Sequence, residues 1–317
     1  MKKKIMLIFM FLLALFPKGN HLLAQGIQTP EEAACIQIDK GEIDKAIEIL
    51  QKVLEASPNN LNAQLYQGVA FFLKEDAEAA FQIFNKIEKE INRMVGAGRS
   101  FGDDAMFAAM AMDRRSGVIF SEERKGLLCF CLGLTLKEKK DLKNAEKKFK
   151  NALKLQYDEM STRLHLFDLY IEMRNLKSAA SQIDELKKIS GENDLLIFLD
   201  GYLKYRNDKT EDALETFESV ASTIGEAKKN IARLYYNKGD YQKSLEIWQG
   251  ILSETLDDKD ALINSGRISF HLGDSQKAQE YFSKAGIQTS PEKISPKNVP
   301  LVYETQMKEI KFDLKCK

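Results

Sequence analysis

The stretch KDALINSGRISFHLGDSQKAQEYFSKA, residues 259–285, contains the pattern on which most of the chain is built. Its apolar and small residues are Ala261, Leu262, Gly266, Ile268 and Phe270 in the first half, and Ala278, Tyr281, Phe282 and Ala285 in the second. Spacings of three and four place side chains on one face of a helix, so the stretch predicts two packed helices. Between them, Gly273 suits the left-handed conformation that ends a helix, and Asp274 suits the cap of the next helix.

The same pattern recurs at a nearly constant interval. The position of Gly266 in the first helix is taken, in chain order, by Ala34, Gly68, Gly133, Phe167, Gly201, Ala232 and Gly266. Successive numbers in this series differ by 34, 65, 34, 34, 31 and 34. The step of 65 is one repeat plus an insertion, and the step of 31 is one repeat shortened by three. The register predicts seven stacked helix pairs, with a bend near residues 221–225, where the short step falls.

These features resemble the tetratricopeptide repeat, a helix–turn–helix unit of about 34 residues with small residues at fixed positions and a bulky aromatic on the second helix. The resemblance covers roughly residues 27–292. It implies an all-α fold, an α-solenoid of helix–turn–helix repeats that forms a right-handed superhelix. It implies no particular activity, because proteins of this family bind many unrelated partners.

The register also divides the chain into parts. We expect repeats 1 and 2 in residues 25–94, a helical insertion in 95–125, repeats 3 to 7 in 126–292, and a carboxyl-terminal segment in 293–317. In the insertion, Gly96, Gly98 and Gly102 are expected to break the helix, and a second short helix would end at Met112. The insertion is either a spur packed on the rod or a lid that binds a partner through its methionines.

In the last segment, the residues Val302, Tyr303, Met307 and Ile310 recur at helical spacing. This spacing favours a capping helix that shields the last repeat over a flexible tail.

The amino-terminal stretch, 1–25, differs from the rest of the chain. Lys2, Lys3 and Lys4 precede an unbroken apolar run of twelve residues, 5–16, and a more polar stretch that ends at Ala24 and Gln25. This order is typical of a secretory signal peptide in residues 1–24, cleaved after Ala24. Twelve residues at about 1.5 Å each do not span a bilayer core of ~30 Å, which disfavours a retained anchor. We expect an exported protein, periplasmic in preference to extracellular or membrane-associated.

The four cysteines are Cys35, Cys129, Cys131 and Cys316. Cys129 and Cys131 lie two apart on one predicted helix, so their side chains diverge and cannot pair. Cys35 and Cys316 fall at opposite ends of the predicted rod. We therefore expect all four to be unpaired, with Cys129 and Cys131 as small buried side chains in preference to a redox pair.

Composition and motifs argue against catalysis, cofactors and nucleic acid. Lys plus Arg and Asp plus Glu both number 47, so the net charge is zero and no basic excess favours nucleic acid. The three histidines are isolated, and neither an HExxH nor a CxxC spacing is present. No serine, cysteine or threonine lies in a recognisable nucleophile motif. We expect no enzyme, no metal and no small-molecule cofactor.

The resemblance further implies a concave groove, lined by the first helices, that holds an extended segment of a partner. The inward positions that we select as partner-binding residues are Phe72, Phe130, Phe198, Tyr202, Tyr205, Lys229, Arg233, Tyr236, Asn264, Arg267 and Phe270. Asp168, Asn230 and Asn237 also fall at inward positions or beside them. The groove is apolar in its first half and aromatic and basic in its second, so we expect repeats 5 to 7 to bind an acidic segment. Phe130 and Phe198 have an alternative place, in the packing between neighbouring repeats.

The function that these features predict is a non-catalytic protein–protein interaction scaffold, an adaptor of the cell envelope. Its partner would be a protein or peptide. Two alternatives stay open at this point. One is a structural or self-associating component whose own tail, or a second copy, fills the groove. The other is a glycan-binding accessory protein that uses the aromatic residues for sugar.

Overall fold

The computed structural model of the protein describes residues 29–99, 120–288, 294, 296 and 299–303. Within these residues it forms fourteen α-helices, in seven consecutive pairs, and no strand. The first helices of the pairs are α2 (Pro30–Asp39), α4 (Leu61–Leu73), α7 (Glu122–Glu138), α9 (Glu159–Glu172), α11 (Asp194–Arg206), α13 (Gly225–Lys238) and α15 (Lys259–His271). The second helices are α3 (Ile43–Ala56), α5 (Ala77–Arg99), α8 (Leu142–Lys154), α10 (Leu176–Ser190), α12 (Thr210–Val220), α14 (Tyr241–Glu254) and α16 (Ser275–Lys284).

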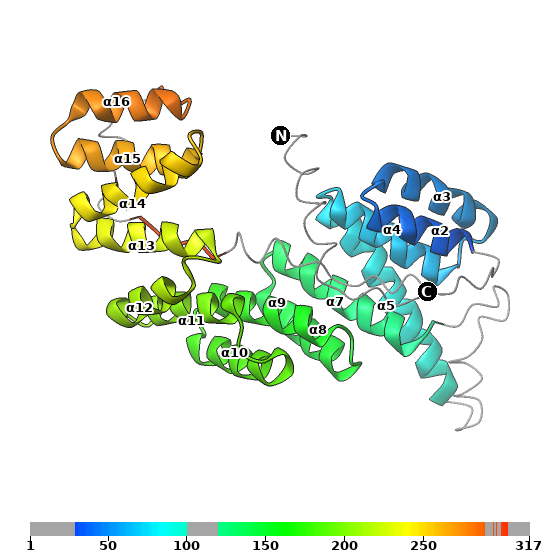
Figure 1. Ribbon diagram of the computed structural model, residues 1–317. Coiled ribbons are helices and arrows are strands. Elements are labelled where there is room, and N and C mark those ends of the chain that lie inside the picture. Colours follow the sequence, from blue (N-terminus) through cyan, green and yellow to red (C-terminus); the bar gives the residue numbers. More distant parts are fainter. Residues whose placement is uncertain (1–28, 100–119, 289–293, 295, 297–298, 304–317) are drawn as a thin grey trace, which may run out of the picture.

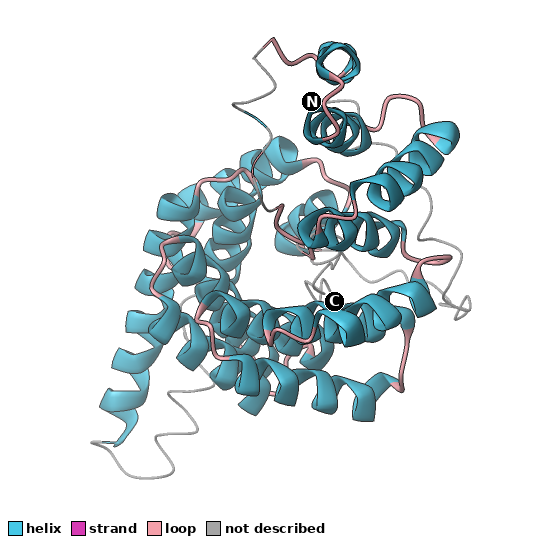
Figure 2. Ribbon diagram, turned by 90° about the vertical axis from the view of Figure 1, so that its left-hand side faces the viewer, coloured by secondary structure: helices cyan, strands magenta, loops and turns pink. Residues whose placement is uncertain are grey.

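The pairs follow one another along a curved path (Figure 1), and the view turned by 90° shows helices joined by loops (Figure 2). This arrangement confirms the predicted all-α solenoid.

Close packing inside four of the pairs depends on a glycine that faces a phenylalanine. The four contacts are Gly68–Phe84, Gly133–Phe149, Gly201–Phe217 and Gly266–Phe282. A Cβ atom added to Gly133 would lie 2.6 Å from the ring of Phe149, closer than Cβ atoms approach in proteins. The ring itself is fully buried. The absence of a side chain therefore sets the distance between the two helices of the pair.

The turn inside each pair has one residue with a positive φ at the same place in the repeat. These residues are Gly41, Glu75, Lys140, Arg174, Asp208, Gly239 and Gly273. Their numbers advance along the chain by the same steps as the first-helix position does, which confirms the register. As predicted, Gly273 is left-handed (φ 87°), and Asp274 caps α16 by accepting a hydrogen bond from the Lys277 amide at 3.0 Å.

The buried side chains form two clusters that meet at α13. Within the repeats the larger runs from Ala34 to Tyr235, whereas the smaller contains Ala232, Trp248 and Ile268. The shortened repeat falls between α12 and α13, and there the yellow and orange helices turn away from the green ones (Figure 1). The bend expected from the short step in the register lies at this junction.

The predicted helix break in the insertion was wrong. α5 continues through Gly96 and Gly98 to Arg99, so the second repeat extends beyond residue 94. A glycine inside a helix costs only about 1 kcal/mol relative to alanine, which a 23-residue helix tolerates. The repeats resume with α7 at Glu122. The short helix ending at Met112 and the spur and lid hypotheses fall in 100–119, outside the described residues.

The described end of the chain is extended. Val299, Leu301 and Tyr303 are buried, whereas Pro300 between them is exposed, and burial at every second residue is the pattern of an extended chain. The predicted helix was therefore wrong for Val302 and Tyr303. Pro300 supplies no backbone donor and disfavours a helical residue before it. Met307 and Ile310 lie outside the described residues.

The cysteines follow the prediction in part. Cys129 and Cys131 are free, and Cys131 is buried. Burial raises the pKa of the Cys129 thiol to about 11, so neither is a ready nucleophile. Cys35, by contrast, is disulfide-bonded, so its predicted unpaired state was wrong. The expectation assumed that the chain ends at the far end of the rod. Instead, Ile294 contacts α15 and Tyr303 contacts α9, so the chain after α16 returns along the repeats toward the amino-terminal end. Cys316 lies outside the described residues.

Candidate partner-binding surface

The inner side of the first helices carries a stretch of the protein's own chain. We call the described residues 294, 296 and 299–303 the tail segment. At its start, Arg267 Nε of α15 donates a hydrogen bond to the Ile294 carbonyl at 2.7 Å. At its end, the Tyr303 hydroxyl donates to Asp168 Oδ1 of α9 at 2.6 Å. The tail segment therefore crosses from α15 over α13 to α9, opposite to the order of the repeats; its last residues are the red stretch beside α13 in Figure 1.

Two asparagines of α13 hold the backbone of the tail segment. Asn237 Nδ2 donates to the Val299 carbonyl at 2.8 Å, and Asn237 Oδ1 accepts from the Val299 amide at 2.7 Å. Asn230 makes the same pair of bonds with Val302, at 2.8 and 3.0 Å. Each side-chain amide thus satisfies both the donor and the acceptor of one residue, as a neighbouring strand would.

The spacing of the asparagines matches an extended chain. Seven residues of helix separate Asn230 from Asn237, two turns that rise about 10.5 Å and bring both side chains to one face. Three extended residues separate Val299 from Val302, and these span about 10 Å. The two lengths agree, so the spacing of Asn230 and Asn237 on α13 matches the spacing of Val299 and Val302 in an extended segment.

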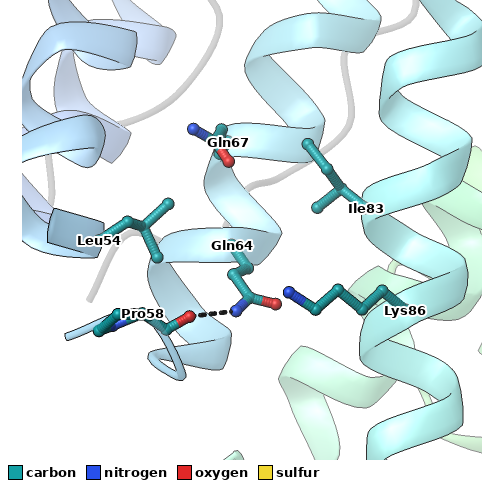
Figure 3. A pocket seen from close by; sticks show the side chains of 6 residues that line it. All are labelled: Leu54, Pro58, Gln64, Gln67, Ile83 and Lys86. Carbon is teal, nitrogen blue, oxygen red and sulfur yellow. Dashed lines mark hydrogen bonds between the residues drawn. The ribbon is translucent and has the colours of Figure 1, made fainter.

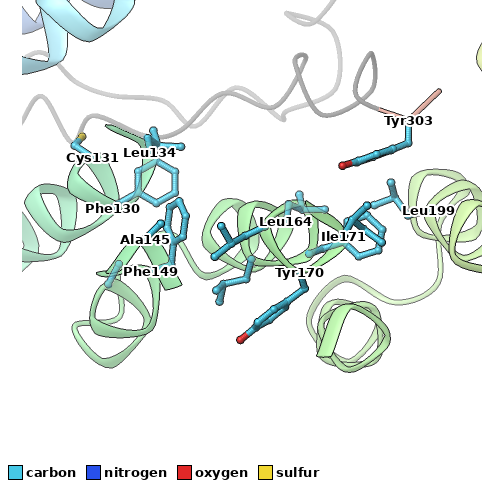
Figure 4. Packing of buried hydrophobic residues seen from close by; sticks show 14 of the residues in the cluster. Phe130, Cys131, Leu134, Ala145, Phe149, Leu164, Tyr170, Ile171, Leu199 and Tyr303 are labelled. Carbon is cyan, nitrogen blue, oxygen red and sulfur yellow. The ribbon is translucent and has the colours of Figure 1, made fainter. Parts of the chain in front are cut away.

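Side-chain recognition is concentrated at Tyr303. Its ring lies 4.3 Å from that of Tyr202, centroid to centroid, and meets Phe167 edge-on at 6.0 Å. Figure 4 shows Tyr303 reaching from the tail segment over Ile171 of α9, with Leu199 of α11 nearby. A buried tyrosine needs a partner for its hydroxyl, and Asp168 supplies it.

The tail segment also joins the two buried clusters. Val299 belongs to the smaller cluster, and Leu301 and Tyr303 to the larger. All three are at most 5% exposed. The tail segment thus buries apolar surface on both sides of the bend.

The basic residues chosen from the sequence are largely neutralised within the chain. Arg233 is 3% exposed and pairs with Glu226 at 2.5 Å and Asp260 at 3.4 Å. Burial raises the pKa of the Glu226 carboxyl, and the neighbouring Arg233 opposes that rise. Lys229 pairs with Asp258 at 2.7 Å. These charges hold α13 to α15, and the segment that lies beside them is apolar.

Arg267 has a different place, because it bonds to the tail segment itself. Its Nη1 donates to Asn264 Oδ1 at 3.0 Å, which orients the guanidinium toward the Ile294 carbonyl. Burial lowers the pKa of Arg267. Beside it, the Tyr236 hydroxyl donates to the Pro296 carbonyl at 2.5 Å, and burial raises the Tyr236 pKa to about 12. Arg267 and Tyr236 thus both donate hydrogen bonds to backbone carbonyls of the tail segment.

The structure brings together some of the selected residues and separates others. Tyr202, Tyr236 and Arg267 contact the tail segment. Phe130 and Phe198 are fully buried in the repeats, against Phe149 and Phe217. Phe72, Tyr205 and Phe270 are half-buried on their first helices. The remaining three are bonded within the repeats: Lys229, Arg233 and Asn264.

Three residues that hold the tail segment were not among those selected. Asp168, Asn230 and Asn237 were recognised as inward or near it, but the selection favoured aromatic and charged side chains. The signal that could have found the pair is two amides seven residues apart on one first helix.

A separate depression of about 170 Å³ lies between α3, α4 and α5 (Figure 3). Its lining residues are Leu54, Pro58, Gln64, Gln67, Ile83 and Lys86. Gln64 is already bonded to the Pro58 carbonyl at 2.6 Å. The lining has no carboxylate, imidazole or thiol for acid–base chemistry.

Across the described ranges, no group of three or more His, Cys, Asp or Glu could hold a metal ion. Nor does any helix in the described ranges combine the length and apolar character that crossing a membrane requires.

Comparison with known proteins agrees with this architecture. A model of the tetratricopeptide repeat family matches residues 32–92 and 229–291. The chain is built from tetratricopeptide repeats. The tetratricopeptide repeat protein from Parabacteroides merdae is similar, at 13% identity and a TM-score of 0.60, over 84% of this chain and 94% of that one. The C-terminal part of a TPR repeat-containing protein from Cytophaga hutchinsonii is similar too, at 12% identity and a TM-score of 0.52. The similarity covers 84% of this chain and 99% of that one.

The APC/C hetero-tetramer Cut9–Hcn1 is also similar, at 11% identity and a TM-score of 0.54, over 86% of this chain and 49% of that one. At such low identities these likenesses show the fold alone. No curated protein matches the sequence.

Proposed function

We propose that this tetratricopeptide repeat protein is a non-catalytic scaffold that holds an extended segment of a partner protein on the inner side of α9 to α15. The observation that carries the proposal is the pair of asparagines on α13. Asn230 and Asn237 each bind the amide and the carbonyl of one residue, at a spacing that extended polypeptide fits. Main-chain recognition of this kind supplies affinity, while pockets for alternate side chains supply specificity.

The chemistry of the surface supports a polypeptide ligand over a sugar or a nucleic acid. A peptide repeats one donor and one acceptor at a fixed interval, which matches the two side-chain amides. Phosphate binding would need free cations, whereas Arg233 and Lys229 are paired with acids of the chain. Of the aromatic residues predicted for sugar, Tyr202 faces the tyrosine of the tail segment.

A second candidate function is structural, in which the tail segment is a permanent strap. The burial of Val299, Leu301 and Tyr303 across the two clusters favours it, because this contact stiffens the bend. The two candidates differ in whether another segment replaces the strap.

The function is tested by selecting displayed peptides on the full chain carrying Leu301→Asp. This substitution places a charge at a buried apolar site and loosens the tail segment. We expect enrichment of related apolar sequences that is lost when Asn230→Ala and Asn237→Ala are added. The matched control is Leu256→Asp, the same change at a leucine that is 84% exposed. No enrichment, or enrichment that survives removal of both asparagines, contradicts the proposed function.

We further propose that the scaffold acts in the cell envelope after export. The basic and apolar order of residues 1–24 supports a signal peptide. The disulfide of Cys35 supports the same compartment, because such bonds persist in oxidising surroundings. Amino-terminal sequencing of the mature protein should start near Gln25. An intact Met1 in a soluble cytoplasmic fraction would contradict export.

A further inference from the structure

We propose that the tail segment is an internal competitor for the partner site, and that this site selects extended segments with the pattern of residues 299–303. In that pattern, buried side chains occupy alternate positions, 299, 301 and 303, and the last of them is a tyrosine. The inference rests on the proposed function and adds to it the ligand class and its regulation.

The tail segment makes the contacts of a ligand. Its hydrogen bonds to the inner face come from side chains of α9, α13 and α15 and reach its carbonyls, its amides and one hydroxyl. At Val299 and Val302 the asparagine side chains take the place of a neighbouring strand. Another extended segment can make the same bonds, because backbone groups do not depend on sequence.

The side-chain pattern supplies selectivity. Val299 and Leu301 fill apolar sites in the two clusters, and charged residues there would be desolvated without a partner. At the third site, the Tyr303 hydroxyl donates to Asp168, a buried carboxylate that also pairs with Lys137. A phenylalanine at this site would leave one Asp168 oxygen without its donor. A site built around a hydroxyl rejects the analogue that lacks it.

The tail segment competes with a free partner segment because it is covalently tethered to the site. The tail segment is part of the same chain, and α16 ends at Lys284, ten residues before Ile294. Linkers of this length give effective concentrations in the millimolar range. A free peptide with the same contacts must exceed that concentration to displace the segment, so the intact protein should bind partners weakly until the tail segment is released.

The experiment is a fluorescence anisotropy titration of a labelled peptide, ISPKNVPLVYET, with the sequence of residues 294–305. Three full-length proteins are compared: wild type, Leu301→Asp, and the control Leu256→Asp. We expect Leu301→Asp to bind the peptide at least ~10-fold more tightly than wild type, since the internal competitor is weakened. The Leu256→Asp protein should behave as wild type.

Two further titrations identify the site and the pattern. Adding Asn230→Ala and Asn237→Ala to the Leu301→Asp protein should abolish binding. Replacing the tyrosine of the peptide with phenylalanine should weaken binding to Leu301→Asp by roughly 10-fold, the loss of one hydrogen bond to a carboxylate.

The outcomes separate the two proposals. Equal affinity of wild type and Leu301→Asp, with dependence on the asparagines, overturns the internal competition and leaves the scaffold function standing. Equal affinity of the tyrosine and phenylalanine peptides overturns the role of Asp168 in selection. If a folded Leu301→Asp protein binds no peptide, both proposals are overturned, and the structural function of the tail segment as a permanent strap is the one that stands.

Folding is checked for each variant by circular dichroism. If Leu301→Asp loses helix content, Tyr303→Ala replaces it as the released protein. The same affinities are then expected, because Tyr303→Ala removes the stacking with Tyr202 and the bond to Asp168 without burying a charge.

Discussion

The two sides of the first helices pack against partners of very different origin. On one side, Gly133 of α7 meets Phe149 of α8, the next helix along the chain. On the other, Asn230 of α13 meets Val302, which is distant in the sequence. The first contact recurs in four of the pairs and is set by apolar shape, whereas the second is made by two asparagines of α13 and is set by hydrogen bonds. The helix-pair interiors thus hold the solenoid together, and the inner face holds the tail segment.

The largest effect is expected inside a helix pair. Gly133→Leu should lower the free energy of unfolding by about 3 kcal/mol or more, because the first added atom already overlaps the Phe149 ring. The matched control is Gly250→Leu in α14, where an added Cβ meets nothing within 4 Å. Chemical denaturation measures both. Equal stability of Gly133→Leu and Gly250→Leu would contradict the assigned glycine–phenylalanine contact.

This contrast explains what could be predicted from the sequence. The position of Gly266 and the seven-fold register followed from a pattern that recurs from one repeat to the next, and the left-handed turn at Gly273 followed with them. The turn at Lys140 did not, because a lysine gives no sign of a positive φ and the repeat imposes it.

The candidate site depends on contacts that no local pattern contains. Tyr202, Tyr236 and Arg267, selected from the sequence for a partner, contact the tail segment, which comes from a distant part of the sequence. Arg233 was assigned to an acidic partner because it is a basic residue at an inward position, yet Glu226 and Asp260 of the chain itself neutralise it. No local pattern reveals such pairing.

Arg233 sharpens the comparison, since it lies on α13 beside Asn230, to which it donates a hydrogen bond at 2.9 Å, and is paired with acids of the chain itself. Arg233→Ala should cost about 3 kcal/mol in the free energy of unfolding, because it leaves the Glu226 carboxylate buried without its partner. Adding Glu226→Leu should restore part of the loss. An Arg233→Ala protein as stable as wild type would contradict the stabilising role of the Arg233–Glu226 pair.

A smaller effect is expected at His165, where interior and inner face meet. Its ring stacks 6.0 Å from Phe149, and burial lowers its pKa to about 4, with Lys137 acting in the same direction and Asp168 and Asp158 against it. The folded state therefore binds its proton more weakly than the unfolded state, for which the pKa is about 6.5. Stability present above pH 6.5 is lost as pH falls toward 4.

Between pH 7 and pH 5 this loss amounts to roughly 1–2 kcal/mol in the free energy of unfolding. His165→Gln, which does not titrate, should show a flatter dependence over that range in urea denaturation. Identical pH profiles for the two proteins would mean that His165 is not buried as a neutral ring.

The most direct measurement of the central claim is amide hydrogen exchange at Val299 and Val302 in the intact protein. Both amides donate to asparagine side chains, at 2.7 and 3.0 Å, and both should exchange at least ~10-fold more slowly than in the free peptide. In the protein with Asn230→Ala and Asn237→Ala, they should exchange as in the free peptide, while the amides of α13 keep their protection. Exchange at the free-peptide rate in the wild-type protein would contradict the account.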